Sequence, residues 1–160
     1  MSFDKAAQFV LTQEGGLVDN PSDPGGLSNM GISLREHPGL NANQIRALTQ
    51  QDAIDLYRSG YWFPTHADEM PDPVGFVLFD SAINEGCDAA VTLLQLALGI
   101  TADGVPGPQT IAAANRATVK WTVARFTMQR VKKYQRTANY LIFGDAWLTR
   151  AVSAAIEAFS

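Results

Sequence analysis

The stretch "EGGLVDNPSDPGGLSNMGIS", residues 14–33, follows directly on an amphipathic helical pattern and decides how the first part of the chain folds. The two glycines after Glu14 end that helix, because glycine adopts the left-handed turn that closes many helices. The turn formers beyond them divide the chain into short pieces, with extended backbone expected at residues 17–18 and 31–33. We therefore expect a small β-hairpin near residues 17–33, directly behind a helix that ends in an acid.

Length and composition limit the possible classes of protein. With 160 residues, of which 46% are hydrophobic and 18% charged, the chain fits one globular domain or two small lobes that share a core. Apolar runs stay well short of the roughly 20 residues that a membrane helix needs, so no membrane insertion is expected. The N-terminus lacks the residue order of a signal peptide, so we expect synthesis in the cytoplasm.

Cys87 is the only cysteine, which excludes an intrachain disulfide, and we expect neither a metal nor a cofactor.

Charge is distributed unevenly along the chain. Residues 1–88 carry thirteen acids and four bases, whereas residues 104–144 carry seven bases and no acid. A basic helix over residues 116–136 is suited to an anionic polymer such as a cell wall, a membrane surface or a nucleic acid. The alternative is a solvated face whose cations balance the acidic half of the chain internally, and we expect no nucleic-acid partner.

The rest of the chain is expected to be mostly helical. Thr49 and Asp52 form a start resembling a capping box for a helix that Gly60 stops. Three prolines interrupt residues 63–74, so we expect a catalytic lobe over residues 1–70 and a helical lobe over residues 71–160, packed as one compact unit. Further helices are expected over residues 74–82, 89–98 and 119–139, after Pro108, and along a last apolar stripe formed by Trp147, Leu148, Ala151, Val152, Ala155, Ile156 and Phe159.

Glu14 is the first candidate for chemistry. Helical spacing from Val10 puts its carboxyl on the apolar face of the helix, where partial burial and the negative end of the helix dipole favour the protonated form. A general acid needs that form. Asp23, in a type II turn, is the candidate second carboxylate, and Ser28 and Asn29 are candidates for holding a water or a sugar hydroxyl. The alternative is a surface acid followed by ordinary turn residues.

Other residues are weaker candidates. Tyr61 and Trp62 come at a helix end and either stack on sugar rings or pack in the core. Asp80 and Asn84 share one helix face because they lie four residues apart, so both can reach the same cleft. Glu85 is interpreted as a surface charge.

Several motifs together resemble one enzyme family. The opening stretch resembles the signature of glycoside hydrolase family 108, the peptidoglycan-cleaving lysozymes found as phage endolysins and in related bacterial secretion systems. The resemblance covers nearly the whole chain, in the family's order. "LTQQDAIDLYRSGYWFP" is similar to its helix ending in Tyr-Trp, "FDSAINEG" to its Phe-Asp-x-Ala-x-Asn-x-Gly motif, and "FGDAWLTRAV" to its closing helix. "LLQLALGITADGVPGPQT" resembles the C-terminal part usually described as peptidoglycan-binding.

The resemblance implies a mainly α, lysozyme-like α+β fold and an N-acetylmuramidase that hydrolyses the bond between N-acetylmuramic acid and N-acetylglucosamine. It makes Glu14 the catalytic acid and places Asp23 at the family's loop aspartate. Leu17 stands where the family has tyrosine, and Ser28 and Ser33 stand where it has threonine. Three readings stay open: hydrolysis with Asp23 as base or nucleophile, lytic transglycosylation by the muramic 6-hydroxyl, and a non-catalytic peptidoglycan-binding module.

The resemblance also implies a setting. The substrate would be peptidoglycan glycan strands, reached in the periplasm or cell wall after release through a holin or a secretion apparatus, as in host lysis by a phage. We expect a monomer.

Overall fold

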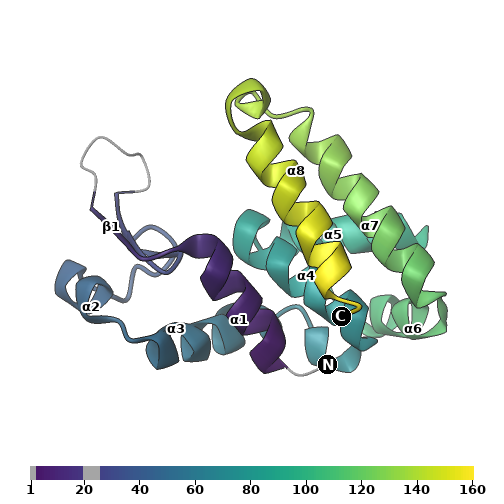
Figure 1. Cartoon of the computed structure of the whole chain (residues 1–160). Helices are drawn as coiled ribbons and strands as arrows, with labels where there is room; N and C mark the ends of the chain where they lie inside the picture. The colour runs from purple at the N-terminus through teal and green to yellow at the C-terminus, as the bar shows by residue number, and fades with distance from the viewer. Residues whose placement is uncertain (1–2, 20–25) are drawn as a thin grey trace.

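The computed structural model describes residues 3–19 and 26–160, and within them the fold is mainly α with one small antiparallel sheet, which confirms the predicted fold class. Figure 1 shows α1 between the sheet, α2 and α3 on one side and the larger group of helices on the other. The elements, in chain order, are α1 (Phe3–Glu14), β1 (Leu17–Asp19), β2 (Leu27–Asn29), β3 (Ile32–Ser33), α2 (Ala42–Ala47), α3 (Gln50–Tyr57), the π-helical η1 (Arg58–Trp62), the 3-10 helix η2 (Ala67–Glu69), α4 (Asp72–Glu85), α5 (Cys87–Leu98), α6 (Pro108–Arg116), α7 (Val119–Tyr134) and α8 (Tyr140–Glu157).

The sheet has three strands in the order β1-β2-β3, with both pairs antiparallel. The extended pieces predicted at residues 17–18 and 31–33 belong to β1 and β3, while β2 between them was not predicted. Asn29 pairs with Ile32 across a turn in which Met30 and Gly31 both have positive φ, +49° and +72°. Two positive φ values in a two-residue loop define a type I′ turn, whose twist matches that of the paired strands.

Helix α3 begins as predicted but ends differently. Thr49 accepts a hydrogen bond from the Asp52 backbone N–H, and the Asp52 side chain accepts one from the Thr49 N–H, so the capping box is present. The predicted stop at Gly60 is wrong, because the chain continues through Gly60 as the wider turns of η1. This continuation carries Trp62 into the core, where its ring lies 5.3 Å from that of Phe3.

Helix α4 lies at the centre of the molecule. It is apolar on nearly every side, with a buried run from Val74 to Ile83, and it contacts α1, α5, α7, α8, η1 and η2. A helix with this composition needs cover all round, which explains why the flanking helices pack on it. One continuous core joins α1 residues such as Val10 to α7 residues such as Phe126. The predicted division at residues 70 and 71, directly before α4, stays a prediction.

The C-terminal helices differ in detail from expectation. Helix α7 ends at Tyr134 rather than near residue 139. The apolar stripe predicted on α8 is partly wrong, because Ala151 is buried whereas Val152 and Ile156 are exposed. The core side of α8 is formed by small residues, which let the helix lie close to its neighbours. Glu157, the last residue of α8, pairs with Lys5 of α1 at 3.1 Å. Among the residues described here, no helix is long and apolar enough to cross a membrane.

The contact between α4 and η2 gives a first prediction. A Cβ atom placed on Gly75 would lie 2.4 Å from the carbonyl oxygen of Ala67. The Gly75→Ala variant gains helix propensity of up to about 1 kcal/mol, but this backbone clash requires α4 to move. We expect a net loss of roughly 1–3 kcal/mol in the free energy of unfolding, measured by urea denaturation. Gly39→Ala, where the added Cβ meets nothing within 4 Å, is the control and should stay within about 0.5 kcal/mol of the unsubstituted protein.

Candidate active site

Glu14 is the last residue of α1, and the helix ends there in a left-handed turn. Gly15 has φ of +71°, as the double glycine predicted. The buried face of α1 is formed by Phe3, Ala6, Ala7, Val10 and Leu11, and Glu14 continues this face toward the sheet. Its side chain is 20% exposed, so it lies at the edge of the core and keeps an opening to solvent.

The Glu14 carboxyl group lies directly against the β2–β3 turn. A Cβ atom on Gly31 would come within 2.9 Å of Cγ, Cδ and Oε2 of Glu14. Glycine at position 31 therefore serves two purposes: it permits the positive φ of the turn, and it leaves room for the carboxyl group. The sequence indicated a turn there but gave no sign of the contact with Glu14.

Arg150, from α8, is the direct partner of Glu14. Its Nη1 lies 2.6 Å from Glu14 Oε1, and its Nε donates to Asp80 Oδ1 at 2.9 Å. Asp80 is fully buried on α4, and its other oxygen, Oδ2, accepts from Nη1 of the buried Arg130 at 2.8 Å. Sequence reasoning placed Asp80 near the cleft but missed both arginines.

The ion pairs continue beyond Arg130. Its Nε lies 3.3 Å from Glu85 Oε1, and Lys133 Nζ lies 2.7 Å from Glu85 Oε2. The interpretation of Glu85 as a surface charge is wrong, because its carboxylate is buried and also accepts hydrogen bonds from Ser81 and Tyr134. We call the six alternating residues the charge row: Glu14, Arg150, Asp80, Arg130, Glu85 and Lys133.

Two tyrosines complete the surroundings of Glu14. The Tyr57 hydroxyl donates to the Met30 carbonyl in the β2–β3 turn, and burial, followed by the charge of Glu14, raises its pKa. Burial raises the pKa of Tyr61 to about 12, with smaller contributions from Glu36 and Glu14. Both hydroxyls therefore stay protonated at neutral pH, and that of Tyr57 donates to the Met30 carbonyl.

The structure places the other predicted site residues differently. Tyr61 is half-buried, and its ring lies 6.3 Å from that of His37. Trp62 is buried among Phe3 and Phe79, which leaves little of its ring to stack on a sugar.

Three polar candidates have protein contacts already. The buried Asn29 side chain donates to the Ile45 carbonyl at 3.0 Å, and Asn84 donates to the Tyr134 hydroxyl at 2.9 Å. Ser28 is half-buried in β2, where it pairs with Val18 and Ser33. Asp23 lies outside the described residues, and substrate binding by the other residues stays a prediction.

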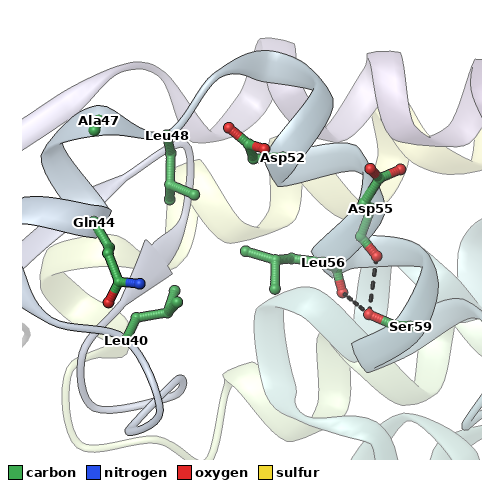
Figure 2. Close-up of a pocket in the computed structure, with 8 residues that line it drawn as sticks. All are labelled: Leu40, Gln44, Ala47, Leu48, Asp52, Asp55, Leu56 and Ser59. Carbon is green, nitrogen blue, oxygen red and sulfur yellow. Dashed lines mark hydrogen bonds between the residues drawn. The ribbon is translucent and has the colours of Figure 1, made fainter.

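A pocket between α2 and α3 lies apart from these residues. It has a volume of about 480 Å³ and contains none of the predicted site residues (Figure 2). The two carboxylates that line this pocket already make hydrogen bonds within α3. Asp52 caps the start of the helix, and Asp55 accepts a hydrogen bond from the Gln51 side chain one turn earlier. In the part of the chain that the structure describes, no three histidine, cysteine or acidic side chains gather to hold a metal ion.

An acid at a helix end beside a small antiparallel sheet, with helices packed behind it, is the arrangement of a lysozyme-like glycoside hydrolase. The sequence model of the family described as glycosyl hydrolase 108 matches residues 7–86, which include Glu14, Gly31, Asp80 and Glu85. A solved structure described as that of Brucella abortus SagA is 33% identical, with a TM-score of 0.90 over 98% of this chain and 93% of that chain. No match was found among the curated proteins.

The chain therefore belongs to glycosyl hydrolase family 108, and membership implies lysozyme-like hydrolysis of peptidoglycan. Arg130, Lys133 and Arg150 lie beyond the matched residues, although the similarity to the SagA structure spans nearly the whole chain. The peptidoglycan-binding character expected of the C-terminal part stays a prediction.

The contact between Gly31 and Glu14 gives a second prediction, with a matched control in the same sheet region. Gly31 and Gly26 both have positive φ, +72° and +64°, so alanine at either position costs about 1–2 kcal/mol of backbone strain. Only at position 31 does the added Cβ displace the Glu14 carboxyl group. We expect Gly31→Ala to lower peptidoglycan hydrolysis by roughly 10- to 100-fold relative to Gly26→Ala, measured by the clearing of a cell-wall suspension. Equal rates for the two variants would show that this contact does not position Glu14.

Proposed function

We propose that the chain is an N-acetylmuramidase that cleaves the bond between N-acetylmuramic acid and N-acetylglucosamine, with Glu14 as the general acid. The observation that carries the proposal is the position of Glu14: it ends α1 at the edge of the core, remains partly exposed, and lies against the Gly31 turn. In this role Glu14 donates its proton to the glycosidic oxygen while positive charge develops on the sugar ring.

A second group must act on the opposite face of the sugar. Asp80 is unsuited to this role, because it is fully buried and both of its oxygens accept from arginines. Asp23 remains our candidate. A separation of roughly 6.5–9.5 Å from Glu14 corresponds to a base and inversion, and one of roughly 5–5.5 Å to a nucleophile and retention. If neither holds, attack by the muramic 6-hydroxyl makes the protein a lytic transglycosylase.

Glycan binding is proposed for the residues around the acid. Tyr61 keeps a neutral hydroxyl, because burial raises its pKa, and Ser28 keeps a hydroxyl on the sheet beside Glu14. Asn29, Trp62 and Asn84 would act mainly by holding these elements in place. The substrate is the peptidoglycan strand, and no nucleic-acid contact is proposed.

The biological setting that we propose is that of a phage endolysin. The monomeric enzyme is made in the cytoplasm and reaches the cell wall when a holin, or the secretion apparatus of a toxin-release system, gives it passage. Action at the cell wall fits a family of peptidoglycan hydrolases. A non-catalytic peptidoglycan-binding module is the competing class of function.

Replacing Glu14 by glutamine separates the two classes. Glu14→Gln keeps the size of the side chain and removes the acid, so we expect cell-wall clearing to fall by about 10²- to 10⁴-fold while sedimentation with purified peptidoglycan is retained. Asp68→Asn, at an exposed acid on η2, is the control and should clear the suspension at the native rate. A Glu14→Gln variant that clears walls normally would contradict the proposed role, and a native protein that binds but never clears would support the binding module.

The products identify the second group. Mass spectrometry of the released muropeptides should show reducing muramic ends for a hydrolase and anhydro-muramic ends for a transglycosylase. We expect reducing ends, and we expect Asp23→Asn to lose activity. Anhydro ends together with an active Asp23→Asn variant would assign the attack to the substrate's own hydroxyl.

A further inference from the structure

We propose that Arg150 and Asp80 are positioning residues for Glu14, and that together they set the pH range over which Glu14 can act as an acid. This inference rests on the proposed role of Glu14. The two residues come from α8 and α4, and they act on Glu14 without needing to touch the glycan themselves.

The geometry makes Arg150 a bridge between two carboxylates. Its guanidinium contacts Glu14 through Nη1 at 2.6 Å and Asp80 through Nε at 2.9 Å. Two contacts in the plane of one rigid group fix the direction in which Arg150 meets Glu14, which a single flexible ammonium contact does not. Asp80 is held on its other side by Arg130, so the bridge is anchored in the core rather than at the surface.

Arg150 and Asp80 act on the proton of Glu14 in opposite directions. The arginine favours the carboxylate that remains after Glu14 has given its proton to the leaving oxygen, so it stabilises the product of proton transfer. Asp80 favours the protonated form, because it adds negative charge on the far side of Arg150 and shares that cation. Because one guanidinium contacts both carboxylates, Asp80 weakens the effect of Arg150 on the proton of Glu14.

The other groups around Glu14 do not replace this pair. Tyr57 from α3 and Tyr61 from η1 are neutral, since burial raises the pKa of both, and Glu36 lies on the Tyr61 side. The β2–β3 turn contributes Gly31, which has no charge. Within the described residues, Arg150 is therefore the cation in direct contact with Glu14.

A purely structural role is the alternative, because the charge row also ties α1, α4, α7 and α8 together. At the alkaline pH values where an aspartate and an arginine both stay charged, loss of a structural ion pair lowers the amount of folded enzyme, or its rate, without moving the limb of the profile. A positioning pair instead moves the alkaline limb of the pH–activity profile, where a general acid loses its proton and activity falls. The sign of the movement depends on which charge is removed.

The test compares the alkaline limb in four variants of the full chain, with peptidoglycan as substrate and thermal unfolding as the check of folding. Arg150→Gln removes the cation and should move the limb up by about one pH unit, with a lower maximal rate. Asp80→Asn removes the anion and should move it down by a similar amount. Arg150→Lys keeps the charge and should leave the limb closer to the native position than Arg150→Gln does. Lys5→Gln removes a cation at the far end of α1 and should leave it unchanged.

A double variant covers the case in which a single substitution leaves a buried charge unpaired and the protein unfolds. Asp80→Asn with Arg150→Gln removes both charges of the pair, and its limb should lie between those of the two single variants. Limbs that coincide in all folded variants would overturn the inference.

Glu14→Gln in the same assay separates the two possible failures. If it is inactive while the limbs coincide, only the positioning role fails. If it retains the native rate, the proposed function itself fails.

Discussion

Asp80 accepts from two arginines in the interior of the molecule, and the arrangement of the helices depends on that double pairing. Its oxygens meet Arg130 from α7 and Arg150 from α8 at 2.8 and 2.9 Å. A charge buried without a partner is costly, and breaking such a pair by removing one member typically costs about 3–5 kcal/mol. Both helices must therefore keep their position and rotation relative to α4. The same pairing holds Arg150 against Glu14, so the ion pairs that fix the packing of the core also fix the surroundings of the acid.

The charge row also explains the uneven charge of the sequence. Arg130, Lys133 and Arg150 come from the basic half of the chain, and their partners come from the acidic half. For these cations the alternative of internal charge balance is the one that the structure shows. Other cations of the basic segment, such as Lys132 and Arg136, are exposed and remain available to an anionic glycan. The segment thus combines structural and surface cations, which a net charge cannot distinguish.

Sequence reasoning succeeded where the cause is local. The helix before Glu14, its glycine end and the Thr49 capping box all depend on residues within a few positions of one another. It failed where the cause is distant. Gly60 did not stop its helix, because the packing of Trp62 against the core outweighs the weak preference of one glycine. Glu85 was taken for a surface charge, because nothing near it in the sequence shows that Arg130 and Lys133 lie beside it.

The mainly helical fold, the family resemblance and the candidate acid all follow from the amino-acid sequence, because helical periodicity, turn residues and motif order can be read along the chain. The surroundings of that acid follow from the packing of helices that lie far apart in the sequence. Arg150 is 136 positions from Glu14, and an arginine on an amphipathic helix has the same sequence pattern whether it faces water or a buried carboxylate. The packing of α8 on α4 determines which of the two it meets, because it brings Arg150 between the carboxylates of Asp80 and Glu14.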